Sequence, residues 1–209
     1  MYHILGRVVA FLIRRIVRFV TGARSLWVGC ESEHKPRIYY ANHRSHIDFI
    51  LLWSSLPRDI RRKTHPIAAS DYWDKNFIRR FLIYRVFNGI VIQRNQKQKN
   101  PLHQVEKILR RGHSVILFPE GTRNLKEDCD LLPFKSGIYH LAKNQPHVEC
   151  IPVWISNLNR VMPKGAFLPL PILSIVSFGA PLKSDFEEKQ EFLQDAHAQL
   201  LALNEREYQ

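Results

Sequence analysis

Apolar and cationic side chains alternate at helical spacing along the first 21 residues. Apolar side chains recur every three or four positions, at Leu5, Val8, Val9, Leu12, Ile16, Phe19 and Val20. Arg7, Arg14, Arg15 and Arg18 fall within an arc of about 100° on the other side, and no acid precedes Glu31. An apolar face backed only by cations is typical of a helix in an anionic membrane surface. We therefore predict that residues 1–24 form a membrane-associating helix; the alternatives are packing on its own domain, or both.

After Pro36 the pattern changes to short apolar runs that alternate with stretches of helical period. The predicted strands are 37–41, 66–69, 90–93, 114–118, 150–155 and 172–178. The predicted helices are 47–56, 76–84, 102–111, 136–143 and 185–204. Strands that alternate with helices at this spacing indicate crossover connections. Residues 25–209 are therefore expected to form a single α/β domain with a mostly parallel sheet flanked by helices.

Composition narrows the class of protein. Apolar residues make up 45% of the 209 residues, which excludes a disordered chain and a protein of many membrane spans. The longest uninterrupted apolar run near the N-terminus, residues 8–13, is too short for a signal peptide or a transmembrane helix. Cys30, Cys129 and Cys150 are few and widely spaced, which is typical of reduced thiols. We expect a peripheral or monotopic protein on the cytoplasmic face of a membrane.

The charge balance points to anionic ligands. Lys and Arg number 31 against 19 Asp and Glu, a net charge of +12, and residues 58–111 are strongly basic. Such a surface attracts nucleic acid, acidic lipid headgroups or phosphorylated substrates, and composition does not choose among them.

The segment Asn42-His43-Arg44-Ser45-His46-Ile47-Asp48 follows the strand at 37–41. On one continuous helix His43 and Asp48 would point about 140° apart, so they meet only if His43 lies in the turn and Asp48 in the first helical turn. There the carboxylate can hold one imidazole nitrogen and leave the other free as a base. His46 is a competing base. On its own this spacing fits a capped turn with surface histidines better.

Phe118-Pro119-Glu120-Gly121-Thr122-Arg123 follows the strand run Val115-Ile116-Leu117. It brings a carboxylate, a glycine, a hydroxyl and a guanidinium to the carboxyl edge of the sheet, where open α/β sheets bind ligands. Arg123 and the amides near Gly121 suit a phosphate, and Arg94, at the end of Gly89-Ile90-Val91-Ile92-Gln93-Arg94, supplies a second guanidinium. A turn with a solvent-exposed ion pair is the alternative. Ile151-Pro152-Val153-Trp154-Ile155 carries no reactive group.

In their order along the chain, these four segments resemble the four sequence blocks of the glycerolipid acyltransferase family, in particular the 1-acylglycerol-3-phosphate acyltransferases. The resemblance runs from about Tyr39 to Ile155, and Phe134-Lys135-Ser136-Gly137 resembles the stretch that follows the third block. Two features depart from it. First, Gly89 lies five residues before Arg94, whereas the family has a spacing of six; Asn88 could take part of the glycine's role in the turn. Second, residues 124–132 carry three acids to which the resemblance assigns no role.

The resemblance implies an enzyme of phospholipid synthesis, an O-acyltransferase. His43 would be the general base and Asp48 its orienting partner. An acyl chain would pass directly from an acyl thioester, acyl-CoA or acyl-carrier protein, to the hydroxyl of a lysophospholipid, most simply 1-acylglycerol-3-phosphate, giving phosphatidic acid. The acceptor would be bound by Arg94, Glu120, Gly121, Thr122 and Arg123, with Glu120 either binding or structural, and Pro152 would shape the acyl-chain side. The resemblance implies no cofactor beyond the co-substrate, no metal and no nucleic acid.

Two other classes of function fit parts of the sequence. A metal-dependent hydrolase could use His43, His46 and Asp48 as ligands, although no second cluster of ligands accompanies them. A non-enzymatic module that binds membranes or nucleic acid would explain the charge of +12 and the arginine-rich helix. It would not explain four ordered motifs at strand ends.

Overall fold

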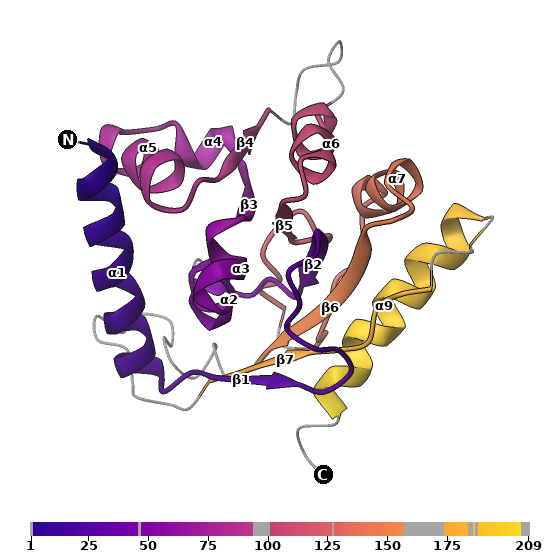
Figure 1. The fold of residues 1–209 in the computed structure, drawn as a ribbon. Helices are drawn as coiled ribbons and strands as arrows, with labels where there is room; N and C mark the ends of the chain where they lie inside the picture. Colours follow the sequence, from indigo (N-terminus) through magenta and orange to yellow (C-terminus); the bar gives the residue numbers. More distant parts are fainter. Residues whose placement is uncertain are drawn as a thin grey trace.

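The computed structural model describes residues 2–45, 47–93, 101–126, 128–156, 174–183, 186 and 188–205. One sheet of seven strands runs through this part of the chain, in the order β1-β7-β6-β2-β5-β3-β4 (Figure 1). Its strands are β1 Arg24–Trp27, β2 Arg37–Ala41, β3 Thr64–Ala69, β4 Ile90–Ile92, β5 Ser114–Leu117, β6 Glu149–Ile155 and β7 Ile175–Phe178. Every neighbouring pair is parallel except β6 and β7.

Helices cover both faces of this sheet. They are α1 Tyr2–Thr21, α2 Asp48–Ser55, α3 Arg58–Arg62, α4 Ser70–Trp73, α5 Phe77–Phe81, the π-helix η1 Leu82–Val86, α6 His103–Arg110, α7 Gly137–Asn144 and α9 Lys189–Glu205. Figure 1 shows α1, α2 and α3 on one side of the sheet and α6, α7 and α9 on the other. The predicted fold class, a mostly parallel α/β domain with an N-terminal helix, is confirmed.

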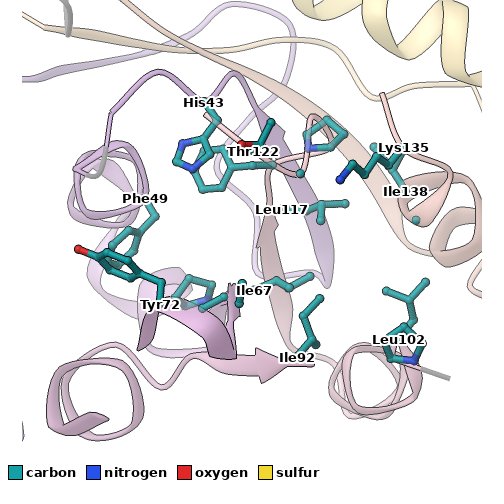
Figure 2. A pocket seen from close by; sticks show the side chains of 18 of the residues that line it. His43, Phe49, Ile67, Tyr72, Ile92, Leu102, Leu117, Thr122, Lys135 and Ile138 are labelled. Atoms are coloured by element: carbon teal, nitrogen blue, oxygen red, sulfur yellow. The ribbon is translucent and has the colours of Figure 1, made fainter. Parts of the chain in front are cut away.

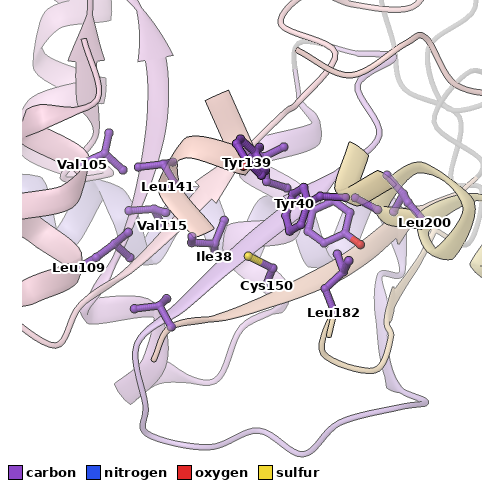
Figure 3. Close-up of a cluster of buried hydrophobic side chains, with 14 of the residues drawn as sticks. Ile38, Tyr40, Val105, Leu109, Val115, Tyr139, Leu141, Cys150, Leu182 and Leu200 are labelled. Atoms are coloured by element: carbon purple, nitrogen blue, oxygen red, sulfur yellow. The ribbon is translucent and has the colours of Figure 1, made fainter. Parts of the chain in front are cut away.

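The core divides into two layers, one on each face. On the face of α6, α7 and α9, buried side chains include Ile38, Tyr40, Val115, Cys150 and Leu200 (Figure 3). The other layer gathers the alternate residues of the same strands under α2, α3 and η1, among them Tyr39, Leu52, Ile116, Ile151 and Phe178. Consecutive strand residues enter opposite layers because side chains alternate across a sheet. Burial on both faces gives the continuous apolar runs of a parallel sheet.

Short elements account for most differences from the sequence prediction. β1, α3 and α4 have four or five residues each and were not predicted. The helix expected over 76–84 is instead α5 followed by η1, whose widened turn is closed by the Phe87 amide donating to the Leu82 carbonyl at 3.0 Å. Asn88 has a positive φ of 52°, so it does take the left-handed turn position beside Gly89.

Helix α1 buries only part of its apolar surface. Val9, Ala10, Ile13 and Val17 pack against the layer under α2 and η1, whereas a stripe on the outer side stays exposed. That exposed stripe consists of Ile4, Leu5, Val8, Phe11, Leu12, Ile16 and Phe19, the last 89% exposed. Helix α1 therefore does pack on its own domain, while the outer part of its apolar face stays exposed. Among the described residues, no helix combines the length and apolar character needed to cross a bilayer.

Candidate active site

The turn between β2 and α2 brings His43 and Asp48 together. His43 lies in the turn and Asp48 is the first residue of α2, and His43 Nδ1 is 2.8 Å from Asp48 Oδ2. The imidazole stacks on the Phe118 ring, 4.4 Å between centroids. Asp48 is fully buried while the His43 side chain keeps 23% of its surface exposed. The carboxylate is thus shielded from water and the base can reach a substrate.

Asp48 Oδ2 is held by three donors. Besides the imidazole, the backbone amides of Arg44 and Ser45 donate to it at 2.7 and 2.8 Å. A carboxylate bonded in this way remains an acceptor, so His43 Nδ1 carries the proton and Nε2 presents its lone pair. The turn therefore fixes both the orientation and the tautomer of His43, as a general base requires.

Glu120 ties the two motif loops together. Its Oε1 accepts from the backbone amide of His43 at 2.7 Å and its Oε2 from the amide of Leu132 at 2.8 Å. The side chain is 2% exposed, and burial raises its pKa while these two amides oppose the rise. With both oxygens bonded to backbone, Glu120 braces the turn that carries His43.

The acidic segment after the third motif also supports this turn. Arg44 Nη2 donates to the Cys129 carbonyl at 2.7 Å and lies 3.3 Å from Asp130 Oδ1. The backbone amide of Asn124 donates to the His43 carbonyl at 2.6 Å. Asp130 is thus a partner of Arg44, a role that the sequence did not reveal.

A tight turn at Gly121 brings a lysine to the site. Gly121 has a φ of +69°, and a Cβ there would lie 2.7–2.8 Å from the side chain of Lys135. The Lys135 amide donates to the Pro119 carbonyl at 2.9 Å, which fixes the approach of the two loops. In the sequence, Lys135 is notable only as part of Phe134-Lys135-Ser136-Gly137, which resembles a stretch of the acyltransferase family. Its contact with the Gly121 turn joins two loops, and no local sequence pattern predicts such a contact.

These groups open onto one cavity of about 840 Å³. At the sheet edge it is lined by His43, Thr122, Arg123 and Lys135, and beyond them by apolar side chains including Phe49, Ile67, Trp73, Ile92 and Leu117. Figure 2 shows His43 and Thr122 at one end, with Ile67, Ile92 and Leu102 toward the other. We call it the catalytic cavity. Glu120 and Pro152 are not among its lining residues.

Two predicted residues cannot be placed. Arg94 and the competing base His46 lie outside the described residues. Within the described ranges, no three His, Cys, Asp or Glu side chains gather closely enough to hold a metal ion.

Comparison with known proteins identifies the family. The family model described as Acyltransferase matches residues 19–156. The 1-acyl-sn-glycerol-3-phosphate acyltransferase of Limnanthes douglasii is 30% identical over 188 residues, 87% of this chain and 62% of that protein. The corresponding enzyme of Haemophilus influenzae is 29% identical over 133 residues, 59% of this chain and 51% of that protein.

A solved structure shares the fold. The crystal structure of PlsC, the 1-acyl-sn-glycerophosphate acyltransferase of Thermotoga maritima, superposes with a TM-score of 0.71 at 21% identity, covering 98% of this chain and 82% of that one. Fold and site thus define an α/β domain with a His–Asp pair at the carboxyl edge of its sheet. The chain belongs to the Acyltransferase family, as the four motifs predicted. It spans about three-fifths of the length of the plant relatives that it matches.

Proposed function

We propose that this protein transfers a fatty acyl chain from an acyl thioester to the free hydroxyl of 1-acylglycerol-3-phosphate, forming phosphatidic acid. One observation carries the proposal: the His43–Asp48 pair stands where the cationic end of the catalytic cavity meets its apolar walls. The named activities of the relatives in Limnanthes douglasii and Haemophilus influenzae support the same reaction.

In the proposed chemistry His43 acts directly on the acceptor. Its Nε2 removes the proton from the acceptor hydroxyl, and the oxygen attacks the thioester carbonyl. The new C–O bond forms, the C–S bond breaks, and the departing thiolate takes the proton back from His43. Asp48 stabilises the transient imidazolium, because a buried carboxylate at 2.8 Å favours the charged ring. No acyl-enzyme and no cofactor other than the thioester co-substrate, acyl-CoA or acyl-carrier protein, is needed.

The cationic end suits the phosphate of the acceptor. Arg123 and Lys135 line the cavity beside the exposed hydroxyl-bearing Thr122, and a guanidinium binds phosphate with paired N–H donors. Gly121 keeps the turn close to Lys135. In this proposal Glu120 acts through the backbone of His43. Arg94, which lies outside the described residues, keeps the acceptor-binding role that the resemblance implies.

The apolar walls suit an acyl chain. A bound acyl chain would leave water for an apolar environment, which stabilises it by about 0.8 kcal/mol for each CH₂ buried. The walls are formed by Phe49, Ile67, Trp73, Ile92 and Leu117.

Membrane association, on the cytoplasmic face, belongs to the same proposal. The exposed apolar stripe of α1 and the neighbouring arginines favour a surface that contains anionic lipids.

The test is acyl transfer from labelled oleoyl-CoA to lysophosphatidic acid in mixed micelles by the purified protein. Wild type is expected to form phosphatidic acid, and His43→Ala to reduce the rate by about 10²–10⁴-fold, the usual contribution of a general base. His147→Ala, an exposed histidine away from the cavity, is the matched control and should retain full activity. Transfer that survives His43→Ala would overturn the mechanism.

Chelator and product analysis separate the alternatives. Phosphatidic acid formed equally with and without chelator supports direct transfer. Release of free fatty acid that stops in chelator would support the metal-dependent hydrolase instead. Repeating the assay with acyl-carrier protein as donor identifies the thioester that the enzyme uses.

A further inference from the structure

A second cavity, of about 810 Å³, lies between α1, α3 and η1. Six arginines line it: Arg7 and Arg14 of α1, Arg58, Arg61 and Arg62 of α3, and Arg85 of η1. We call it the arginine cavity. It shares no lining residue with the catalytic cavity. Three separate elements therefore direct cations into one space that the proposed acyl transfer does not use.

No carboxylate balances this charge in the described structure. The lining residues include no Asp or Glu, and none of the six arginines forms an ion pair with a described carboxylate. Asp59, the acid within α3, is not part of the lining. Guanidinium groups gathered without counter-charge repel one another, so the cavity favours an anion.

Arg61 lies at the centre of this repulsion. Its Nη1 donates to the Leu56 carbonyl at 2.8 Å and its guanidinium lies 5.1 Å from the centroid of the Trp53 ring. Burial, together with the positive charges of Arg14, Arg18, Arg58 and Arg62, lowers the pKa of Arg61 to about 10. A group so placed gains from an anion that contacts it and its neighbours together.

The cavity is held in shape by the packing of α1. Gly6 approaches η1 so closely that a Cβ there would lie 2.5 Å from the Arg85 carbonyl oxygen. Trp53 and Phe87 supply aromatic walls, with ring centroids 5.2 Å apart. The arginines of α1 and α3 therefore face one another across a fixed gap.

We propose that the arginine cavity binds the phosphate of an anionic membrane lipid, with a preference for a phosphomonoester headgroup. Phe11 supports a lipid source, because it lines the cavity, is 54% exposed and belongs to the apolar stripe of α1. A lipid whose chains lie along that stripe brings its phosphate to the arginines. A phosphomonoester carries a charge of about −1.5 to −2 at neutral pH and three acceptor oxygens, which several guanidinium groups can share.

The first experiment compares two pairs of substitutions that remove equal charge. Binding of the full chain is measured with phosphatidylcholine vesicles that contain either phosphatidic acid or phosphatidylglycerol, at about 0.15 M salt. Arg58→Gln/Arg62→Gln should weaken binding to phosphatidic acid vesicles about 25-fold, since each arginine near an anionic surface contributes roughly a factor of five. Lys107→Gln/Arg111→Gln, exposed cations on and just after α6, should change it less than about threefold.

Two neighbouring positions of α1 give a finer comparison. Arg14 lines the cavity, whereas Arg15 is exposed outside it, with its guanidinium 5.8 Å from the Phe11 ring. Arg14→Gln should reduce the preference for phosphatidic acid over phosphatidylglycerol. Arg15→Gln should weaken binding to both vesicles alike and leave the preference unchanged. Circular dichroism spectra that match wild type show that each variant is folded.

Three outcomes decide the proposal. Equal losses for the two pairs would show diffuse attraction only and overturn it, as would an unchanged preference in Arg14→Gln. Inorganic phosphate is the second arm. If it raises the melting temperature of wild type but not of Arg58→Gln/Arg62→Gln, and both proteins bind vesicles equally, the cavity takes free phosphate and the lipid source is wrong. Because vesicle binding is measured without acyl donor, failure here is distinct from failure of the proposed acyl transfer.

Discussion

The two cavities differ in how their charged groups are compensated. At the edge of the catalytic cavity Asp48 Oδ2 accepts three hydrogen bonds and Glu120 accepts from two backbone amides, so the oxygens that hold the His43 turn are bonded before any substrate arrives. Asp48 Oδ1 is buried without a hydrogen-bond partner among the described residues. In the arginine cavity six guanidinium groups converge without a described carboxylate. The first arrangement holds a base in one geometry, as catalysis requires. The second is completed only by a ligand, as a binding site for an anion requires.

The largest expected effect breaks the first arrangement. Asp48→Asn keeps the size of the side chain but removes the charge that stabilises the imidazolium of His43. We expect kcat for acyl transfer to fall by about 10³-fold or more, with little change in lipid binding. Steady-state kinetics beside vesicle binding test this. A variant with near-normal kcat would show that Asp48 only holds the turn before α2.

The next effect concerns the turn at Gly121. Gly121→Ala places a Cβ against Lys135 and forces a positive φ on alanine, so we expect a loss of about 1–2 kcal/mol in unfolding free energy and a higher KM for the acceptor. Gly112→Ala is the matched control: its φ is +78°, a Cβ there meets nothing within 4 Å, and Gly112 does not line the catalytic cavity. Equal behaviour of the two variants in urea unfolding and kinetics would contradict this role for Gly121.

A third substitution changes the arginine cavity without changing its charge. Gly6→Ala forces α1 away from the Arg85 carbonyl, so Arg14 and the arginines of α3 no longer face each other at the same distance. The preference for phosphatidic acid should fall about threefold, a smaller loss than removing two charges. If vesicle preference is unchanged, the spacing of the arginines is unimportant and their number alone matters.

The smallest expected effect is a pH dependence next to the arginine cavity. His65 Nδ1 bonds to the carbonyl of Asn88, a lining residue, and its Nε2 lies 2.8 Å from His113 Nδ1. Burial lowers the pKa of both His65 and His113 below 6.5. Their neutral forms therefore stabilise the fold fully above pH 6.5, and this contribution is lost as the pH falls through the lowered pKa values.

The melting temperature measured from pH 7.5 down to 5 tests this dependence. His65→Gln/His113→Gln should give a shallower decline than wild type below pH 6.5. The exposed His147→Gln should decline as steeply as wild type. A double variant with an unaltered slope would assign the acid sensitivity to other groups.

Local pattern was enough to predict the strand, turn and helix around the candidate base. β2 has the predicted bounds, and the turn places His43 and Asp48 as their spacing required. Their contact spans five residues, so it depends only on where the strand ends and the helix begins. The membrane contact of α1 stays a prediction, although the structure divides its apolar face between the domain and an exposed stripe.

Long-range contacts could not be predicted in this way. The Glu120 brace joins residues 77 positions apart, and Lys135 reaches the site because two loops pack together. The arginine cavity is a similar case. The sequence shows cations in α1 and in the basic middle of the chain, but only the fold brings Arg14, Arg61 and Arg85 to one space.

The pairing of β1 with β7 limits how early the sheet can be completed while the chain is synthesised. Arg24–Trp27 is synthesised before every other described strand, yet its only neighbour among those strands is Ile175–Phe178, the last of them. β2, which leads into the turn that holds His43, likewise waits for β6 before both its edges are paired. Contacts this distant in sequence form slowly. Until then the core layer on which α1 packs lacks the side chains of β6 and β7, so the helix exists before the sheet that supports it is complete.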